Sequence, residues 1–189
     1  MWPPSLHDDL VRLRPLQLDD REPLFATLSS DRGISRWTRI PWPYERVHLD
    51  QFFALVDTWR RARTDAAFAV TADGDDTLVG CIGVHRIGGV WIPRSSFLPD
   101  EPGYWLAAPA RGRGLMTRSL RLVCAWLFDD VGRPQVNIQT KVGNIPSRAV
   151  VERVGFRYTG TVAASEVDDD PNPADHDRYL LTRADMRRQ

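Results

Sequence analysis

The sequence predicts a single α/β domain in which a central mixed β-sheet carries helices on both faces. Two observations lead to this prediction. Apolar runs of strand length and segments of helical periodicity follow one another in the order β-α-α-β-β-β-α-β-α-β-β. The first half is rich in hairpin signals, whereas the second half repeats strand, helix, strand, helix. We therefore expect antiparallel pairs and a crossover helix within the same sheet.

The N-terminal part is expected to supply one strand and two helices. Residues 1–9 contain two prolines and read as a loose arm, and residues 10–16 alternate apolar side chains with arginine, which favours a half-exposed strand. Asp19 or Asp20 can cap the first helix. Residues 45–63 then carry apolar side chains at spacings of three and four, which is typical of an amphipathic helix packed on a core.

Between these two helices, residues 34–44 are rich in tryptophan and proline, so we expect an ordered loop there rather than a linker. Aromatic loops often line pockets, and Trp37 and Trp42 are therefore candidate substrate-binding residues. Downstream, the apolar runs 66–71 and 78–87 flank Asp73-Gly74-Asp75-Asp76, a strong hairpin signal.

The second half begins with a strand that starts at Glu101 and ends in a glycine-containing turn. The remaining elements are a helix from 116 to the stop at 132–134, a strand over 136–140, a helix from Asn144 to Gly155, and strands over 156–166 and 177–183 joined by the acidic loop 168–173. Proline in the first turn and glycine at the end support the second of these helices.

Length and composition bound the possible functions. With 189 residues, 42% of them hydrophobic, the chain can fill one core but is short for two, so we expect one domain over 10–183 between an N-terminal arm, 1–9, and a C-terminal tail, 184–189. The 25 basic and 25 acidic residues cancel, which argues against nucleic acid or an anionic membrane as a partner. The oligomeric state is left open, a homodimer included.

The two cysteines, Cys81 and Cys124, lie in apolar runs without metal-ligand spacing, so buried free thiols and no metal site are expected. No apolar stretch of 18 residues and no basic-then-apolar leader occurs. A soluble, cytoplasmic protein follows as the expectation, since free thiols persist in reducing compartments.

The most informative stretch is the turn RGRG over 111–114, which joins a strand to a helix. Its glycines let the backbone approach a ligand closely, and the N–H groups of the following helix form an anion site. The two arginines of the turn and Arg118 would suit a phosphate or pyrophosphate. The motif is no P-loop, since no Lys-Ser or Lys-Thr follows, and no dinucleotide fingerprint, because Thr117 occupies the third glycine position.

This turn resembles the acyl-coenzyme A loop of the GNAT N-acetyltransferases, Gln/Arg-x-x-Gly-x-Gly/Ala. The segment Pro109–Gly114 matches both glycines but has Pro109 where Gln or Arg is usual. Two further motifs resemble the RimJ/RimL-like branch of the family, namely Gly103-Tyr104-Trp105-Leu106, and Asn144-Ile145-Pro146-Ser147 followed by Gly155-Phe156. The resemblance covers about residues 10–183 and implies the GNAT fold, in which two strands splay apart around the pantetheine arm.

The resemblance implies that acetyl is transferred from acetyl-CoA to a primary amine by direct attack. The acceptor could be the α-amine of a protein N-terminus or a small-molecule amine. The implied acetyl-CoA-binding residues are Leu106, Ala107, Arg111, Gly112, Arg113, Gly114, Leu115, Met116, Thr117, Asn144 and Ser147. Asn144 also reads as a plain helix N-cap, and the two roles can coexist.

An amine must lose its proton before it attacks, so a base is required. Within the resemblance, Glu166 occupies the place of the RimL-type base, and the acidic residues 168–170 would raise its pKa and attract a cationic acceptor. A solvated strand end is its alternative reading. Glu101 is the second candidate, whereas His85 and His176 are expected to be spectators.

The departing thiolate needs a hydroxyl donor. The tyrosine that many GNAT enzymes use is replaced by Val151, so the resemblance assigns this role to Ser147, with a local hydrogen bond in the first helical turn as its alternative. Because of Val151 and Pro109, a second function stays open, in which the protein is a non-catalytic module that binds or senses acyl-CoA.

Overall fold

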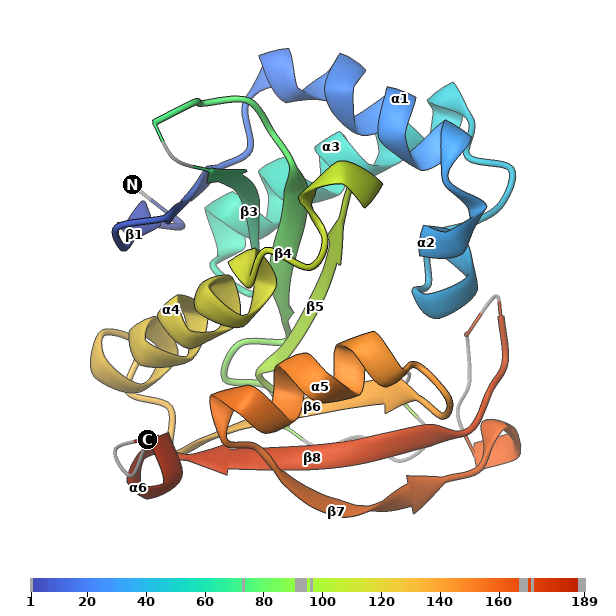
Figure 1. The fold of residues 1–189 in the computed structure, drawn as a ribbon. Helices are drawn as coiled ribbons and strands as arrows, with labels where there is room; N and C mark the ends of the chain where they lie inside the picture. Colours follow the sequence, from blue (N-terminus) through green and yellow to red (C-terminus); the bar gives the residue numbers. More distant parts are fainter. Residues whose placement is uncertain are drawn as a thin grey trace.

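The computed structural model describes residues 2–72, 74–90, 95, 97–166, 170 and 172–186, and these form two antiparallel sheets with helices around them (Figure 1). The first sheet is ordered β1 (Leu6–His7), β2 (Val11–Pro15), β3 (Ala66–Ala72), β4 (Gly80–His85), β5 (Glu101–Leu106); the second is ordered β6 (Gln135–Lys141), β8 (His176–Thr182), β7 (Arg157–Val162). The helices are α1 (Arg21–Ser30), α2 (Arg32–Trp37), α3 (Arg46–Ala62), α4 (Leu115–Asp129), α5 (Ile145–Val154) and α6 (Arg183–Met186), with short 3-10 turns at Leu18–Asp20, Ala108–Ala110 and Ala164–Glu166.

Strand β3 is buried on both faces, which explains why its sequence is a continuous apolar run. Phe68 and Val70 belong to the core that α4 covers, whereas Ala67 and Ala69 belong to the core that α1, α2 and α3 cover. Figure 1 shows α4 in front of the first sheet and α3 behind it. The predicted α/β fold with helices on both faces is therefore confirmed.

The strands form two sheets, and the division falls between β5 and β6. These are the strand before the glycine turn and the strand after the following helix, where the family resemblance implied that two strands splay apart. The side-chain amide of Asn137 donates to the carbonyl of Pro99 at 2.8 Å, and the side-chain amide of Gln139 donates to the Glu101 carboxylate at 3.0 Å. Going from Asn137 to Gln139 moves the partner from Pro99 to Glu101, so β5 and β6 run in the same direction where this contact lies. Beyond that point no backbone ladder joins β5 to β6 in the described residues, and Figure 1 shows them diverging.

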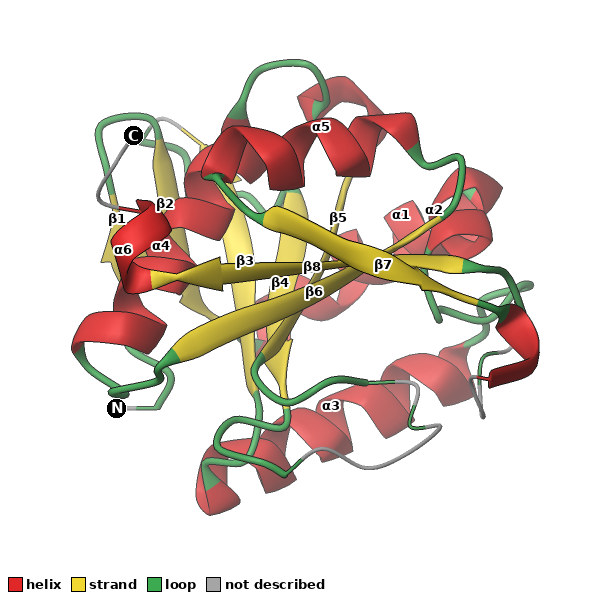
Figure 2. Cartoon of the chain, turned by 90° about the horizontal axis from the view of Figure 1, so that it is seen from below, coloured by secondary structure: helices red, strands yellow, loops and turns green. Residues whose placement is uncertain are grey.

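Figure 2 looks onto the second sheet, whose strands cross in front of those of the first. Helix α5 packs between the sheets and α4: its residues Val151 and Val154 are buried in the same core as Leu120 of α4 and Ile138 of β6. The second sheet therefore stays attached to the first through side-chain packing rather than through strand pairing.

One expected loop contains a helix. Residues 34–44 were expected to lack regular structure, but α2 runs to Trp37, and the Asp31 side chain caps it by accepting from the N–H of Gly33 at 2.9 Å. Residues 38–45 then form the loop, with Tyr44 buried in the core. A helix of six residues contains too few turns to show a clear apolar period, so the pattern alone could not reveal it.

The N-terminal residues lie against the domain rather than forming a loose arm. Strand β1 pairs with β2, with Leu6 opposite Leu13. The Trp2 ring packs on Trp126 of α4 at 5.1 Å between centroids, and its indole N–H donates to the carbonyl of Asp65 at 3.1 Å.

The predicted hairpin joins β3 to β4, with Ala66 opposite Val84, although Asp73 of its turn lies outside the described residues. Cys81 and Cys124 are buried free thiols, as predicted. Among the residues that the structure describes, none of the helices combines the length and the apolar composition that crossing a membrane requires.

Candidate active site

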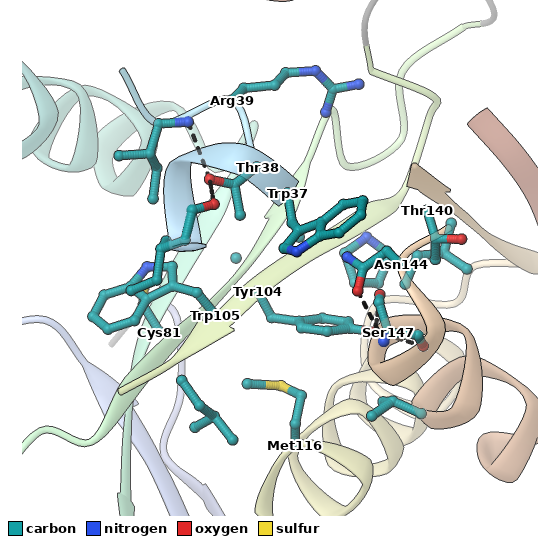
Figure 3. A pocket seen from close by; sticks show the side chains of 18 of the residues that line it. Trp37, Thr38, Arg39, Cys81, Tyr104, Trp105, Met116, Thr140, Asn144 and Ser147 are labelled. Atoms are coloured by element: carbon teal, nitrogen blue, oxygen red, sulfur yellow. Dashed lines mark hydrogen bonds between the residues drawn. The ribbon is translucent and has the colours of Figure 1, made fainter. Parts of the chain in front are cut away.

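A cavity of about 950 Å³ opens where β5 and β6 separate. Its walls come from α1, α2 and α3 on one side, from β5 and the start of α4 on another, and from β6 and the start of α5 on the third. Figure 3 shows side chains from all three walls around one space, among them Trp37, Tyr104, Met116 and Ser147. A single space thus receives the glycine turn, the central strand and the Asn-x-x-Ser helix.

The glycine turn presents unpaired backbone N–H groups to this cavity. Gly112 and Gly114 have φ values of +75° and +78°, and a Cβ built on either would meet nothing within 4 Å. Gly114 caps α4 without a side-chain hydrogen bond, and the N–H of Arg118 makes the first intrahelical bond. In the described part of the chain the N–H groups of residues 115–117 therefore have no partner, which makes the start of α4 a candidate anion site.

Two of the three arginines around the turn, Arg111 and Arg118, bind carboxylates of the protein itself. Arg111 binds Asp31 at 2.5 Å and donates from Nε to the carbonyl of Leu106 at 2.9 Å. Arg118 binds Asp8 and Asp9 at 2.8 and 2.7 Å. Arg113 is exposed, and its side chain has no partner in the part of the chain that the structure describes. The paired arginines brace the turn, so the backbone N–H groups are the main anion-binding feature.

Of the two residues at the end of β5 that were expected to bind acetyl-CoA, Leu106 and Ala107, only Leu106 borders the cavity among the described wall residues. The N–H of Ala107 donates to the carbonyl of Val79 at 2.9 Å and so points toward β4. Because successive residues of a strand point their peptide groups to opposite sides, those of Leu106 face away from β4 and toward the opening. Leu106 lines the cavity, whereas Ala107 does not.

Asn144 and Ser147 meet Tyr104 across the opening between the sheets. The Asn144 side chain accepts from the N–H of Ser147 at 3.3 Å, so its role as the N-cap of α5 is confirmed. The Oγ of Ser147 lies 3.0 Å from the Oη of Tyr104 on β5. Tyr104 is part of the Gly-Tyr-Trp-Leu motif, but its sequence position indicates no role, because nothing local relates it to a serine 43 residues away.

Glu101 is a buried carboxylate on the cavity wall, with only 3% of its surface exposed. It accepts from the N–H of Leu98 at 2.5 Å and from Gln139, and a guanidinium nitrogen of Arg39 lies 3.9 Å away. Burial raises the pKa of Glu101 above its ordinary value, because the desolvation of the charged form outweighs Arg39 and these hydrogen bonds.

Glu166 lies elsewhere. It ends the short turn Ala164–Glu166, its side chain is exposed, and it is not part of the cavity wall. Of its acidic neighbours, Asp168 and Asp169 lie outside the described residues, whereas Asp170 is buried against Lys141 at 3.4 Å. An acidic side chain already held by a lysine offers little attraction to a cationic ligand.

Of the other candidates, Trp37 lines the cavity, whereas Trp42 is 40% exposed and does not. His85 also lines it, with Nδ1 3.3 Å from the carboxylate of Asp65, and His176 is a buried wall residue. Both histidines were expected to be spectators. Their places on the cavity wall depend on how distant elements pack, which sequence spacing does not show.

The comparisons with known proteins agree with this geometry. Residues 11–157 match the model of the Acetyltransferase (GNAT) domain, and the chain belongs to this family. It is similar to the Bacillus subtilis (strain 168) protein "Putative ribosomal N-acetyltransferase YdaF", with 33% identity over 107 residues, which are 56% of this chain and 55% of that protein. The chain thus spans about half the length of this curated relative.

Solved structures share the whole fold. Mycobacterium smegmatis RimJ in complex with CoA-disulfide has a TM-score of 0.79 at 24% identity, covering 97% of this chain and 89% of that one. Spermidine N-acetyltransferase from Vibrio cholerae, in complex with CoA and spermine, has a TM-score of 0.74 at 19% identity, covering 95% and 99%. The family that the three sequence motifs indicated is therefore confirmed.

If the glycine turn binds the pyrophosphate of acetyl-CoA, replacing Gly112 by valine should weaken acetyl-CoA binding by at least about tenfold, because a Cβ would fill the open approach and φ of +75° is strained for valine. Isothermal titration calorimetry measures this. Gly74→Val is the matched control, since Gly74 has φ of +76°, equally open surroundings and a place in the distant β3–β4 turn. Equal affinities for both variants and the wild type would contradict the assignment.

Proposed function

We propose that this protein transfers acetyl from acetyl-CoA to a primary amine by direct attack of the amine on the thioester. One observation supports this most strongly: an anion-binding helix start, a buried carboxylate and a serine hydroxyl line the same cavity. A module that only bound acyl-CoA would need the first of these and not the other two. The names of the similar proteins, which are acetyltransferases, support the same activity.

Acetyl-CoA fits the residues present. The open approach at Gly112 and Gly114 and the unpaired N–H groups of residues 115–117 suit a pyrophosphate, and the outward N–H of Leu106, whose carbonyl already accepts from Arg111, suits an extended arm with amides. Bound acetyl-CoA would supply the activated acetyl group. The residues of the chain then orient it, remove a proton from the amine and assist the leaving sulfur.

Glu101 is the base in this proposal, in place of Glu166. A carboxylate with an ordinary pKa is a weak base at neutral pH, and burial of Glu101 moves its pKa in the useful direction. The exposed Glu166 side chain has neither this burial nor a place on the cavity wall. Glu101 accepts the amine proton, directly or through a water, and returns it to solvent after the acetyl group has moved.

Ser147 assists the leaving group. Its Oγ borders the cavity at the start of α5, where the positive end of the helix dipole also favours a developing negative charge. As the C–S bond breaks, the electron pair goes to sulfur and the serine O–H supplies the hydrogen bond and proton. Val151 is buried in the core and has no hydroxyl to offer.

The charges of the cavity wall favour an acceptor with a single amine. Among the described wall residues, Glu101 is the one carboxylate, and Arg39, Arg111 and Lys141 on the wall are each already paired with an acidic side chain of the protein. A polyamine would bring further ammonium groups that find no second carboxylate on this wall. The rest of the wall is largely aromatic and aliphatic, from α2 and α3. We therefore propose a peptide α-amine or a small monoamine as the acceptor.

The base assignment predicts a pH profile. Since Glu101 must be ionised to accept a proton and its pKa is raised, the rate of the wild type should fall on acidification at a pH above the ordinary glutamate value. Glu101→Gln should lower kcat/KM about 100-fold or more near neutrality and regain part of it at high pH, where the amine is already neutral. Glu166→Gln is the control and should behave as the wild type. The reverse pattern would return the role to Glu166.

The acceptor assignment predicts selectivity in an assay of free CoA release. Peptides with a free α-amine and small monoamines should be acetylated with kcat/KM at least about tenfold above that of spermidine, because the cavity wall offers no second carboxylate to the further ammonium groups of spermidine. A preference for spermidine would contradict it. Acetyl-CoA binding without CoA release for any amine of a broad panel would favour the non-catalytic module instead.

A further inference from the structure

The hydroxyl of Tyr104 links strand β5 of the first sheet to helix α5 at the point where the two sheets separate. Tyr104 belongs to β5, its ring packs against the main core, and its hydroxyl reaches the first turn of α5. There the Oη lies 3.0 Å from the Oγ of Ser147 and 3.4 Å from the carbonyl oxygen of the same residue. Figure 3 shows the phenol ring pointing across the cavity toward Ser147.

The hydroxyl of Tyr104 remains protonated. Burial raises the pKa of Tyr104 well above its ordinary value, and the bond from Ser147 opposes this only in part. Tyr104 is therefore a neutral group with one hydrogen to donate. Of its two possible acceptors on Ser147, the Oγ is the closer.

Ser147 is held from its other side as well. Its N–H donates to the side chain of Asn144, which fixes the residue in the first turn of α5. A serine hydroxyl has two lone pairs and one hydrogen. If the tyrosine occupies one lone pair, the serine hydrogen must point elsewhere, and the neighbouring space is the cavity.

We propose that Tyr104 is a positioning residue for Ser147: its Oη–H donates to the Ser147 Oγ and thereby directs the serine hydrogen toward the sulfur that leaves. This inference rests on the proposed function, in which Ser147 assists the leaving thiolate. When the C–S bond breaks and sulfur takes the electron pair, the serine proton moves to sulfur. Solvent replaces the proton on Oγ as it leaves, so no free alkoxide forms, and the bond from Tyr104, which keeps its own proton, holds Oγ in place throughout.

A cycle of variants tests the inference. Tyr104→Phe removes only the hydroxyl, so the core contacts of the ring persist. We expect kcat to fall about 5- to 15-fold, as for the loss of one hydrogen bond, with the dissociation constant of acetyl-CoA and the melting temperature nearly unchanged. Tyr158→Phe is the matched control, because that exposed tyrosine bonds Thr161 on β7, away from the cavity.

The double variant separates positioning from a structural effect. If Tyr104 acts through Ser147, adding Tyr104→Phe to Ser147→Ala should change kcat by less than about twofold, since the group that it positions is already gone. An equal loss from Tyr104→Phe in both backgrounds, or wild-type kcat in Tyr104→Phe, would overturn the inference. Wild-type kcat in Ser147→Ala would instead show that the proposed role of Ser147 is wrong, and the inference would end with it.

Discussion

The missing ladder between β5 and β6 is the constraint on which the rest of the structure depends. The two strands are joined at their start by side-chain hydrogen bonds from Asn137 and Gln139, and in the described residues no backbone bonds continue this contact. Backbone groups at the open edge of β5 must then find partners other than a strand. An extended ligand with amide groups can supply them, which links the division of the sheet to the proposed acetyl-CoA site.

The elements around this opening are held by ion pairs that join distant parts of the chain. Arg111 joins the glycine turn to the N-cap of α2, and Arg118 joins α4 to the turn before β2. Lys141 and Asp170 form a buried pair beside β8. Since these charges are satisfied within the protein, the unpaired N–H groups at the start of α4 are the groups best suited to bind an anionic ligand.

Much of the fold could be predicted from the sequence, because its signals are local. The β3–β4 hairpin, the long amphipathic helices and the N-cap at Asn144 follow from turn residues and periodicity over a few positions. The division of the sheet was implied by the family resemblance alone, because strand patterns are the same whether or not a ladder forms between two neighbours. Helix α2 was missed because its six residues are too few to show an apolar period.

One part of the candidate site, the glycine turn, could be predicted because its signal is also local. The glycine turn is a local motif, and the structure gives it the open, unpaired geometry that the motif indicated. Choosing between Glu101 and Glu166 depends on burial, which reflects tertiary packing. The contact between Tyr104 and Ser147 joins a strand to a helix that follows a whole crossover later, so neither spacing nor composition could reveal it.

Amide hydrogen exchange with and without CoA tests the central claim most directly, because it reports on the backbone groups themselves. Without ligand, the amides of residues 115–117 should exchange quickly, as they have no partner in the described part of the chain. Saturating CoA should slow exchange at residues 112–117 and at Leu106 by about tenfold or more, with little change in α3. Protection confined to other elements, with residues 112–117 unchanged, would contradict the account.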